Sequence, residues 1–212
     1  MIEDVTGIVV CHNTKALIKR AYESIRKFHP DMPIIIIDGS DKGDPCVAYC
    51  KSLASEMTQV ISLGHNIGHG RGMHMGINKA STKYALIFDS DIEMIDSPLA
   101  AMLDMMEEDT FGVGSVRKIK INVSQSGFIP VLYLHPFFQL INIENYRKFP
   151  PYIHHGAPCV KTMLDIKRRG LSEKIFKDFP DLNRYIKHYH RGTRKDRVRR
   201  GLSQVVGGWE QI

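Results

Sequence analysis

The sequence predicts an α/β protein with a mostly parallel central sheet flanked by helices. Short apolar segments alternate along the chain with segments whose apolar residues recur at helical spacing, which is the pattern of an α/β fold. The clearest strand covers residues 33–38, where four consecutive isoleucines indicate a strand covered on both faces, as in a parallel sheet. Further strands are expected at residues 5–10, 60–63 and 84–88.

Helices are expected at residues 17–28, 47–57 and 71–80, between these strands, and at 99–106, after the last of them. That first helix follows Asn13 and Thr14, either of which can cap a helix, and it stops before Pro30. After about residue 112 the pattern changes, with strands expected at 111–116 and 137–143 and a helix at 159–169. The chain has 212 residues, 43% of them hydrophobic, and no repeat or linker, so we expect a single domain.

The apolar stretches, the first residues and the cysteines indicate in which cellular compartment the protein is expected. No stretch approaches the roughly 20 apolar residues that span a bilayer, and the acidic start does not resemble a signal peptide. The chain has four cysteines, Cys11, Cys46, Cys50 and Cys159. The spacing of Cys46 and Cys50 suits one helix face better than a zinc knuckle. We therefore expect reduced, partly buried thiols in a cytoplasmic protein.

The net charge of +6 is unevenly distributed. Six basic residues crowd the C-terminal end between Arg191 and Arg200, and Lys167–Arg169 form a smaller cluster. Such patches favour phosphate-bearing partners, namely a nucleotide diphosphate, a nucleic acid or an anionic membrane. A solvated tail that aids solubility would have the same composition.

Polar residues follow each of the first four expected strands. Ligands of open α/β sheets bind beyond the carboxyl ends of the strands, so these residues should converge on one rim. They are Cys11, His12 and Asn13 after the first strand, Asp38, Ser40 and Asp41 after the second, residues 64–76 after the third, and Asp89, Ser90 and Asp91 after the fourth.

The Asp89-Ser90-Asp91 triplet is the first candidate metal site on this rim. Two carboxylates at the end of a buried strand form a compact oxygen site for Mg²⁺ or Mn²⁺, which also take substrate phosphate oxygens. Such a cation neutralises a departing diphosphate. An exposed strand-end turn or a helix cap is the alternative interpretation of the same spacing.

Residues 64–76 form a glycine-dense, basic segment. Glycines let backbone amides approach an anion, and Arg71 could contact a phosphate. The spacing fits neither the dinucleotide-binding fingerprint nor a P-loop, which disfavours those two classes. His65, His69 and His74 form either a zinc cluster or, as we favour, polar loop and helix residues. Near the end of the chain, His188 or His190 could complete a carboxylate metal site with Arg191 on the diphosphate, unless this segment is a surface helix end.

Together these motifs resemble the GT-A glycosyltransferases, and most closely those of family 2, over residues 5–193. Residues 9–13 look like the first strand of that family with its nucleotide-contacting Asn13, and residues 37–41 resemble its second-strand element around Asp38 and Ser40. Residues 66–72 are similar to its glycine loop, which includes Asn66, Gly68, Arg71 and Gly72, and Phe88–Asp91 to its D-x-D motif.

The resemblance implies a GT-A domain with a nucleotide-sugar-binding half at about residues 1–115, an acceptor-side half at about 116–200 and a basic C-terminal tail. It implies transfer of a hexose from a UDP-, GDP- or dTDP-sugar with Mn²⁺ or Mg²⁺. Asp91 would bind the metal directly, whereas Asp89 would reach the ribose or the metal. The C-terminal His-x-x-x-Gly-Thr pattern resembles the last metal-ligand segment of the family and allows His188 or His190, of which we favour His190.

The second half departs from the family pattern at the catalytic base. An inverting transfer, which the resemblance implies, needs a base for the acceptor hydroxyl. Thr162 and Met163 stand where relatives carry an acidic pair, so Asp165 is the first candidate and His154 or His155 the next.

The acceptor could be a saccharide, a lipid-linked acceptor or a modified DNA base, the last suggested by the basic C-terminus. A non-catalytic nucleic-acid-binding protein on a degenerate transferase scaffold is the alternative. A sugar-1-phosphate nucleotidyltransferase is disfavoured, because residues 11–14 lack the glycine- and arginine-rich loop of that class.

Overall fold

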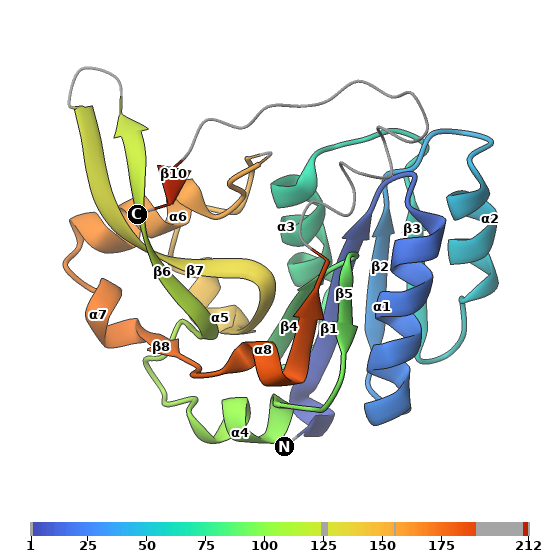
Figure 1. Cartoon of the computed structure of the whole chain (residues 1–212), viewed down its shortest axis with the longest axis horizontal. Helices are drawn as coiled ribbons and strands as arrows, with labels where there is room; N and C mark the ends of the chain where they lie inside the picture. The colour runs from blue at the N-terminus through green and yellow to red at the C-terminus, as the bar shows by residue number, and fades with distance from the viewer. Residues whose placement is uncertain (1, 124–126, 155, 190–209, 212) are drawn as a thin grey trace.

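The computed structural model describes residues 2–123, 127–154, 156–189 and 210–211. A central sheet with the strand order β10-β6-β7-β4-β1-β2-β3 runs through the molecule, with β8 added beside β6. Helices cover both faces of its parallel part (Figure 1). The predicted α/β class, with a mixed but mostly parallel central sheet, is confirmed.

The first half of the chain forms the parallel part of the sheet, as predicted. Its strands are β1 (Val5–Cys11), β2 (Ile34–Asp38), β3 (Thr58–Ser62) and β4 (Tyr84–Asp89). They pair in parallel, with Cys11 opposite Asp38 and Asp38 opposite Ser62. On the other side of β1, Val10 lies opposite Asp89. The carboxyl ends of these strands therefore meet at one edge of the sheet.

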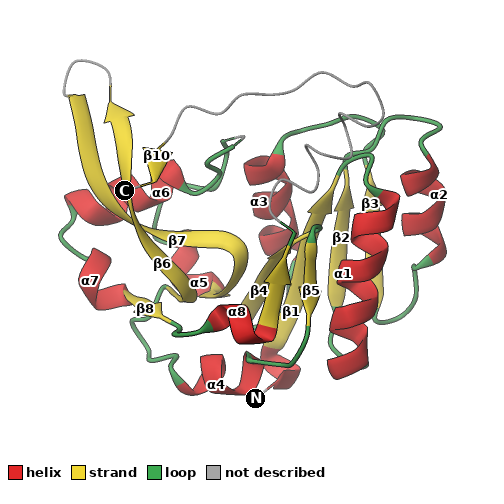
Figure 2. Ribbon diagram, in the orientation of Figure 1, coloured by secondary structure: helices red, strands yellow, loops and turns green. Residues whose placement is uncertain are grey.

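Helices α1 (Lys15–Phe28), α2 (Pro45–Ser52) and α3 (His69–Lys79) connect these strands, and α4 (Leu99–Asp104) follows the turn after β4. Helices α1 and α2 lie on one side of the sheet and α3 lies on the other (Figure 2). Alternate side chains of each strand serve the two faces. On β2, Ile34 and Ile36 pack in the core beneath α1, whereas Ile35 and Ile37 pack in the core beneath α3.

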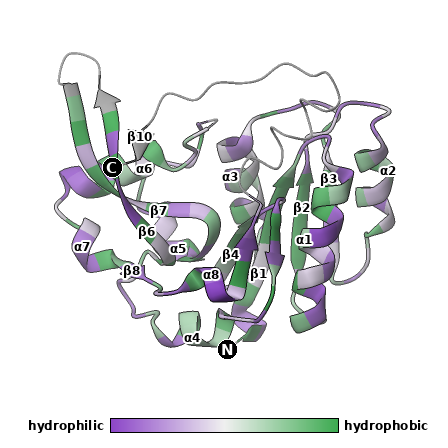
Figure 3. Ribbon diagram, in the orientation of Figure 1, coloured by the Kyte–Doolittle hydropathy of each residue, from purple (hydrophilic) through white to green (hydrophobic). Residues whose placement is uncertain are grey.

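Burial on both faces explains the continuous apolar segments of the strands. All five residues of β2 are buried, and the first five of β4 are buried as well. These strands stand out as hydrophobic among more hydrophilic loops (Figure 3).

Two glycines let α3 approach β1 closely. A Cβ atom added at Gly76 would lie 2.4 Å from Cγ2 of Ile8, and one added at Gly72 would lie 2.7 Å from Cγ1 of Val10. Because Ile8 is fully buried in the middle of the sheet, its methyl group has no room to move aside. The glycines of this segment therefore fix the position of α3 against the strand.

The second half of the chain adds antiparallel strands. β6 (Gly112–Val123) and β7 (Gly127–Asn142) form a long hairpin, in which β7 pairs with β4. The sequence predicted only the stretches at 111–116 and 137–143, so it missed most of this hairpin. The pairing of β6 and β7 changes register between Gly114 and Val116, which is an irregularity of the β-bulge type.

Short elements complete the fold. β5 pairs with β9 in a separate two-stranded antiparallel sheet, and β8 pairs in parallel with β6. None of these short strands was predicted, whereas the helix expected at 159–169 is present as α6. The remaining elements are η1 (Ile2–Asp4), β5 (Ile92–Met94), α5 (Ile143–Arg147), α6 (Val160–Arg168), α7 (Ser172–Ile175), β8 (Phe176–Asp178), α8 (Leu182–Tyr185), β9 (Ile186–His188) and β10 (Glu210–Gln211).

The close packing of α3 on β1 leads to a test. We expect Gly76→Ala to lower the free energy of unfolding by about 1–3 kcal/mol, because overpacking outweighs the better helix propensity of alanine. Denaturant unfolding followed by circular dichroism measures the change. Lys79→Ala, at an exposed position of the same helix, should stay within about 0.5 kcal/mol of the wild type. A Gly76→Ala variant as stable as the wild type would contradict the close packing.

Candidate active site

The Asp89-Ser90-Asp91 triplet forms a turn between two strands at the carboxyl edge of the sheet. β4 ends at Asp89 and β5 begins at Ile92. The side chain of Asp89 is 19% exposed and that of Asp91 10%, so both carboxylates are largely withdrawn from solvent. The predicted strand-end position of the triplet is confirmed.

A histidine from the far end of the chain joins the two carboxylates. Pairing of β5 with β9 sets Ile92 opposite His188, and the N–H of Tyr189 donates to the carbonyl oxygen of Asp91 at 2.9 Å. These contacts bring Nε2 of His188 to 3.2 Å from Oδ1 of Asp91 and 3.8 Å from Oδ2 of Asp89. His188, one of the two histidines that the sequence analysis offered, therefore lies beside both carboxylates; His190, which it favoured, and Arg191 lie outside the described residues, and their roles stay predictions.

This trio has the composition of a divalent-cation site. One ligand atom from each of Asp89, Asp91 and His188 lies within 4.8 Å of the others. Two carboxylate oxygens and one imidazole nitrogen suit Mn²⁺ or Mg²⁺ completed by phosphate oxygens and water. The residues present thus fit the cation that the D-x-D motif predicts.

Aromatic packing fixes the ring of His188. It stacks on Phe137 of β7, with the ring centroids 4.9 Å apart and the planes 4° from parallel. His135 contacts the same phenylalanine edge-on at 5.3 Å, and the guanidinium of Arg117 lies 5.9 Å from the Phe137 ring centroid. The β6–β7 hairpin thus supports the imidazole of His188 through Phe137, a role that nothing in the local sequence indicated.

His69, the first residue of α3, approaches the carboxylates from the opposite side. Its Nε2 lies 3.3 Å from Oδ1 of Asp89. The other two histidines of the segment point elsewhere, since Nδ1 of His65 contacts the Leu63 carbonyl and Nδ1 of His74 contacts the Tyr146 hydroxyl. Among the described residues, the three histidines form no common metal cluster, which agrees with the interpretation that the sequence favoured.

The charges of the site are mutually dependent. Burial alone would raise the pKa of Asp89, but the charge of His69, its hydrogen bond and the charge of His188 outweigh it and lower that pKa. Burial opposes protonation of His69 and His188, yet contacts with the aspartates raise the pKa of both. His135 behaves differently, because burial lowers its pKa to about 4. A cluster of this kind holds negative charge that a cation can neutralise.

The residues predicted after β1 and β2 form an ordered loop pair. The N–H of Asn13, a residue with φ of 55°, donates to Oγ of Ser40 at 2.9 Å. The side-chain amide of Asn13 donates to Oδ2 of Asp41 at 2.6 Å, and its Oδ1 accepts from the Asp41 N–H. The two loops therefore hold one another in place beside the carboxylate site.

Three of the residues predicted to contact the nucleotide are buried within or below this loop pair. Asp38 and Ser40 have no exposed surface, and Cys11 is 2% exposed. Asp38 accepts a hydrogen bond from the N–H of Ser40 at 2.9 Å. In this arrangement these side chains shape the loops from within, and their contact with a nucleotide stays a prediction.

The glycine loop before α3 differs from the expected anion cradle. The N–H of Gly68 donates to Oδ1 of Asn66, that of Gly70 to the His154 carbonyl, and that of Gly72 to the Gly68 carbonyl. Since these three amides are already hydrogen-bonded within the chain, binding of a phosphate by this loop stays a prediction. Gly68 instead supplies a positive φ of 86° at the N-cap of α3, and Gly72 gives close packing.

Gly70 packs against the backbone of His154, in the second half of the chain. A Cβ atom at this position would lie 2.7 Å from the backbone nitrogen of His154. The exposed His154 therefore lies in a segment packed against the residue that follows His69. His155, the next candidate base, lies outside the described residues.

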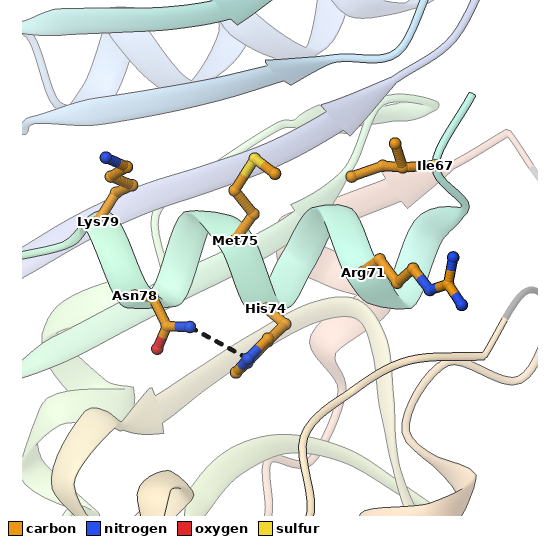
Figure 4. Close-up of a pocket in the computed structure, with 6 residues that line it drawn as sticks. All are labelled: Ile67, Arg71, His74, Met75, Asn78 and Lys79. Atoms are coloured by element: carbon orange, nitrogen blue, oxygen red, sulfur yellow. Dashed lines mark hydrogen bonds between the residues drawn. The ribbon is translucent and has the colours of Figure 1, made fainter. Parts of the chain in front are cut away.

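Arg71 projects from the first turn of α3 into a pocket along that helix. Figure 4 shows Arg71 at one end of the pocket and Lys79 at the other, with His74 and Asn78 hydrogen-bonded between them. Arg71 is exposed, and its contact with a phosphate stays a prediction. Ile67 and Met75 supply the apolar part of the lining.

Asp165, the first candidate base, lies on α6 and forms an ion pair with Nη2 of Arg169 at 2.7 Å. None of the contacts found among the described residues joins Asp165 to the aspartates of the D-x-D motif. Its role as a base stays a prediction.

A mostly parallel α/β sheet with a D-x-D carboxylate pair at its carboxyl edge is the arrangement expected of a GT-A transferase. The sequence profile described as "Glycosyl transferase family 2" matches residues 6–165. The chain therefore belongs to glycosyltransferase family 2. No curated protein sequence matches it significantly.

Solved structures support the same fold. A mannosyltransferase from Pyrobaculum calidifontis, in complex with GDP-Man and Mn²⁺, matches with a TM-score of 0.62 at 16% identity, over 84% of this chain and 55% of its own. S. aureus TarS 1-349 in complex with UDP-GlcNAc matches with a TM-score of 0.57 at 14% identity, over 84% and 56%. GalNAc-T7 with UDP, GalNAc and Mn²⁺ matches with a TM-score of 0.57 at 13% identity, over 74% and 39%.

The chain spans little more than half the length of the first two of these proteins and less of the third. At these identities the matches establish the GT-A fold. In the part of the chain that the structure describes, no helix is both long and apolar enough to cross a bilayer.

The geometry of the carboxylate–histidine trio leads to a second test. We expect His188→Ala to weaken Mn²⁺ binding by about tenfold or more, since it removes one protein ligand of a small set. Titration calorimetry or the electron paramagnetic resonance of free Mn²⁺ measures the affinity. Lys187→Ala, on the exposed side of β9, is the matched control and should bind as the wild type does. Equal affinity in His188→Ala would remove His188 from the ligand set.

Proposed function

We propose that the chain is a metal-dependent glycosyltransferase that moves a sugar from a nucleotide-diphosphate sugar to an acceptor hydroxyl. The observation that carries this proposal is the convergence of Asp89, Asp91 and His188 at the carboxyl edge of the sheet. The solved structures of the same fold that hold GDP-Man with Mn²⁺, or UDP with Mn²⁺, support a donor of this class. A UDP-, GDP- or dTDP-sugar is accordingly the proposed donor, with Mn²⁺ or Mg²⁺ as the cation.

When bound, the cation supplies positive charge beside the diphosphate leaving group. Asp89, Asp91 and His188 would hold it, and Phe137 keeps the imidazole of His188 in plane by stacking. Ser90 shapes the turn between the two aspartates. Arg71, and Arg191 by analogy with the family motif, would contact the diphosphate as charged hydrogen-bond donors.

His69 has a distinct part in this proposal. Its contact with Asp89 orients that carboxylate and balances its charge in the absence of a cation. It would therefore stabilise the site between turnovers. Because α3 is fixed on β1 by Gly72 and Gly76, the position of His69 is fixed as well.

The acceptor side is less closely defined. We propose inverting transfer of a hexose, with Asp165 or a histidine of the 154–155 segment as the base. The packing of His154 on Gly70 favours the histidine segment, because it joins this segment to the helix that carries His69. The four free, buried cysteines favour a reducing compartment such as the cytoplasm.

The donor proposal is tested by nucleotide binding. In the presence of Mn²⁺, UDP, GDP or dTDP should raise the melting temperature of the wild type, because a ligand that binds only the native state stabilises it. Asp91→Ala should lose both this shift and the hydrolysis of the nucleotide sugar. Asp104→Ala, an exposed position on α4, serves as the control for loss of a carboxylate. Metal-independent binding that Asp91→Ala leaves unchanged would sink the assignment.

The acceptor proposal includes a modified DNA base beside saccharide and lipid-linked acceptors, because basic residues crowd the end of the chain. Binding to duplex DNA should then fall steeply as salt rises, since Lys and Arg contacts release counterions. Absence of binding at low salt would remove DNA from the acceptors. Duplex binding without any turnover of nucleotide sugar would instead favour a non-catalytic nucleic-acid-binding protein.

A further inference from the structure

A second cluster of metal-ligating side chains lies apart from the D-x-D motif. It consists of Cys11 at the end of β1, Asp38 at the end of β2, and Cys46 and Cys50 on α2. One ligand atom from each lies within 4.8 Å of all the others. Each side chain is buried, with Cys11 2% exposed and the other three at 0%. The cluster is defined hereafter as the thiol–carboxylate cluster.

The two clusters share no residue, and their carboxylates come from different strands. Cys11, Cys46 and Cys50 belong to the core beneath α1 and α2. Asp89 follows Phe88, which faces that same core, and so it points to the other face, where it meets His69 of α3. The thiol–carboxylate cluster is therefore a separate site.

Three of the distances within the cluster match the edges of a tetrahedron around zinc. With Zn–S bonds of about 2.3 Å, two sulfurs of a tetrahedral site lie about 3.8 Å apart, and a sulfur and a carboxylate oxygen about 3.6 Å apart. The Sγ atoms of Cys11 and Cys50 are 3.6 Å apart, and those of Cys46 and Cys50 are 3.8 Å apart. The Cys11 Sγ lies 3.7 Å from Oδ1 of Asp38.

The carboxylate distinguishes a metal site from a cluster of neutral thiols. Asp38 is fully buried, and its hydrogen-bond donors are the N–H of Ser40, the hydroxyl of Ser62 and the thiol of Cys11. Among the described residues, no Lys, Arg or His forms an ion pair with it. A buried carboxylate without a countercharge is unfavourable, and a cation bound by the three sulfurs would supply that charge.

Local structure favours a thiolate at one of the three cysteines. Cys46 lies in the first turn of α2, after Pro45 and the N-cap Asp44, where the helix dipole stabilises negative charge. Hydrogen bonds from Cys11 and then Cys50 lower the pKa of the Cys46 thiol, whereas hydrogen bonds within the cluster and burial raise the pKa of Cys11 and of Cys50. A thiolate is the form in which cysteine binds metal.

We propose that Cys11, Asp38, Cys46 and Cys50 form a structural zinc site that ties α2 to the carboxyl ends of β1 and β2. The ligand set has three soft sulfurs and no open position, which suits a structural Zn²⁺ rather than Mn²⁺ or Mg²⁺. Binding would release the thiol protons and fix the loop pair of Asn13 and Ser40 that rises from these strands. Asp38 would also hold the loop after β2 in place, because its Oδ1 accepts the hydrogen bond from the N–H of Ser40.

The test uses the whole chain, untagged and kept reduced, with Co²⁺ and Zn²⁺ as probes. Co²⁺ should give a thiolate-to-metal charge-transfer band in the near ultraviolet and the visible bands of tetrahedral cobalt, and Zn²⁺ should abolish both by displacing it. Metal analysis should find one tightly held Zn²⁺ per chain. A strong chelator should remove it and lower the melting temperature.

Variants separate this site from the donor site. Cys50→Ser should lose the charge-transfer band, whereas Cys159→Ser, the same change at a buried cysteine outside the cluster, should keep it. Asp91→Ala should also keep it while losing Mn²⁺-dependent nucleotide binding. Failure of the donor proposal would thus leave the cobalt spectrum unchanged, and failure of the zinc proposal would leave nucleotide binding unchanged.

The proposal is overturned if the reduced, folded wild type gives no thiolate-to-cobalt band, or if the band survives in Cys50→Ser. The wild-type spectrum decides even where Cys50→Ser does not fold. A disulfide between Cys11 and Cys50, detected by mass spectrometry in protein prepared under reducing conditions, would overturn it too, because it removes two of the ligands.

Discussion

The site depends on the pairing of β1 with strands on both sides. β1 lies between β2 and β4, and the parallel register aligns Cys11 with Asp38 and Val10 with Asp89. All the residues that follow these strands must therefore emerge at one edge. The apolar residues of these strands are buried on both faces, so the polar residues at the strand ends can reach solvent only beyond the carboxyl edge of the sheet.

The parallel half of the fold was predictable because its signal is local. A short run of β-branched isoleucines bounded by proline, aspartate and glycine favours a strand buried on both faces, and helical spacing marks the segments between the strands. The β6–β7 hairpin was largely missed, although Lys118–Ile121 alternates exposed lysines with buried isoleucines. Pro130 and Pro136 interrupt the partner strand and obscured the alternation. The three-residue strands β5 and β9 have no local signal at all.

The site residues also divide into those that local sequence reveals and those that depend on long-range pairing. Asp89 and Asp91 were identified from their place at a strand end, which is a local property. The approach of His188 to these carboxylates was not, because it follows from the pairing of two segments far apart in the sequence. His69 and Phe137 were missed as site residues for the same reason. What sequence reasoning lacks is the long-range register that decides which side chains face a distant carboxylate.

Two metal sites on one sheet edge would require chemical separation, and the fold supplies it. The D-x-D side offers oxygens and an imidazole, which suit hard cations that share their coordination with phosphate. The thiol–carboxylate cluster offers soft sulfurs, fully enclosed beneath α2. Because adjacent residues of a strand face opposite sides of the sheet, Val10 and Cys11 point to different cores. A zinc ion held by the sulfurs would then stiffen the nucleotide loops without competing for the cation that the sugar donor requires.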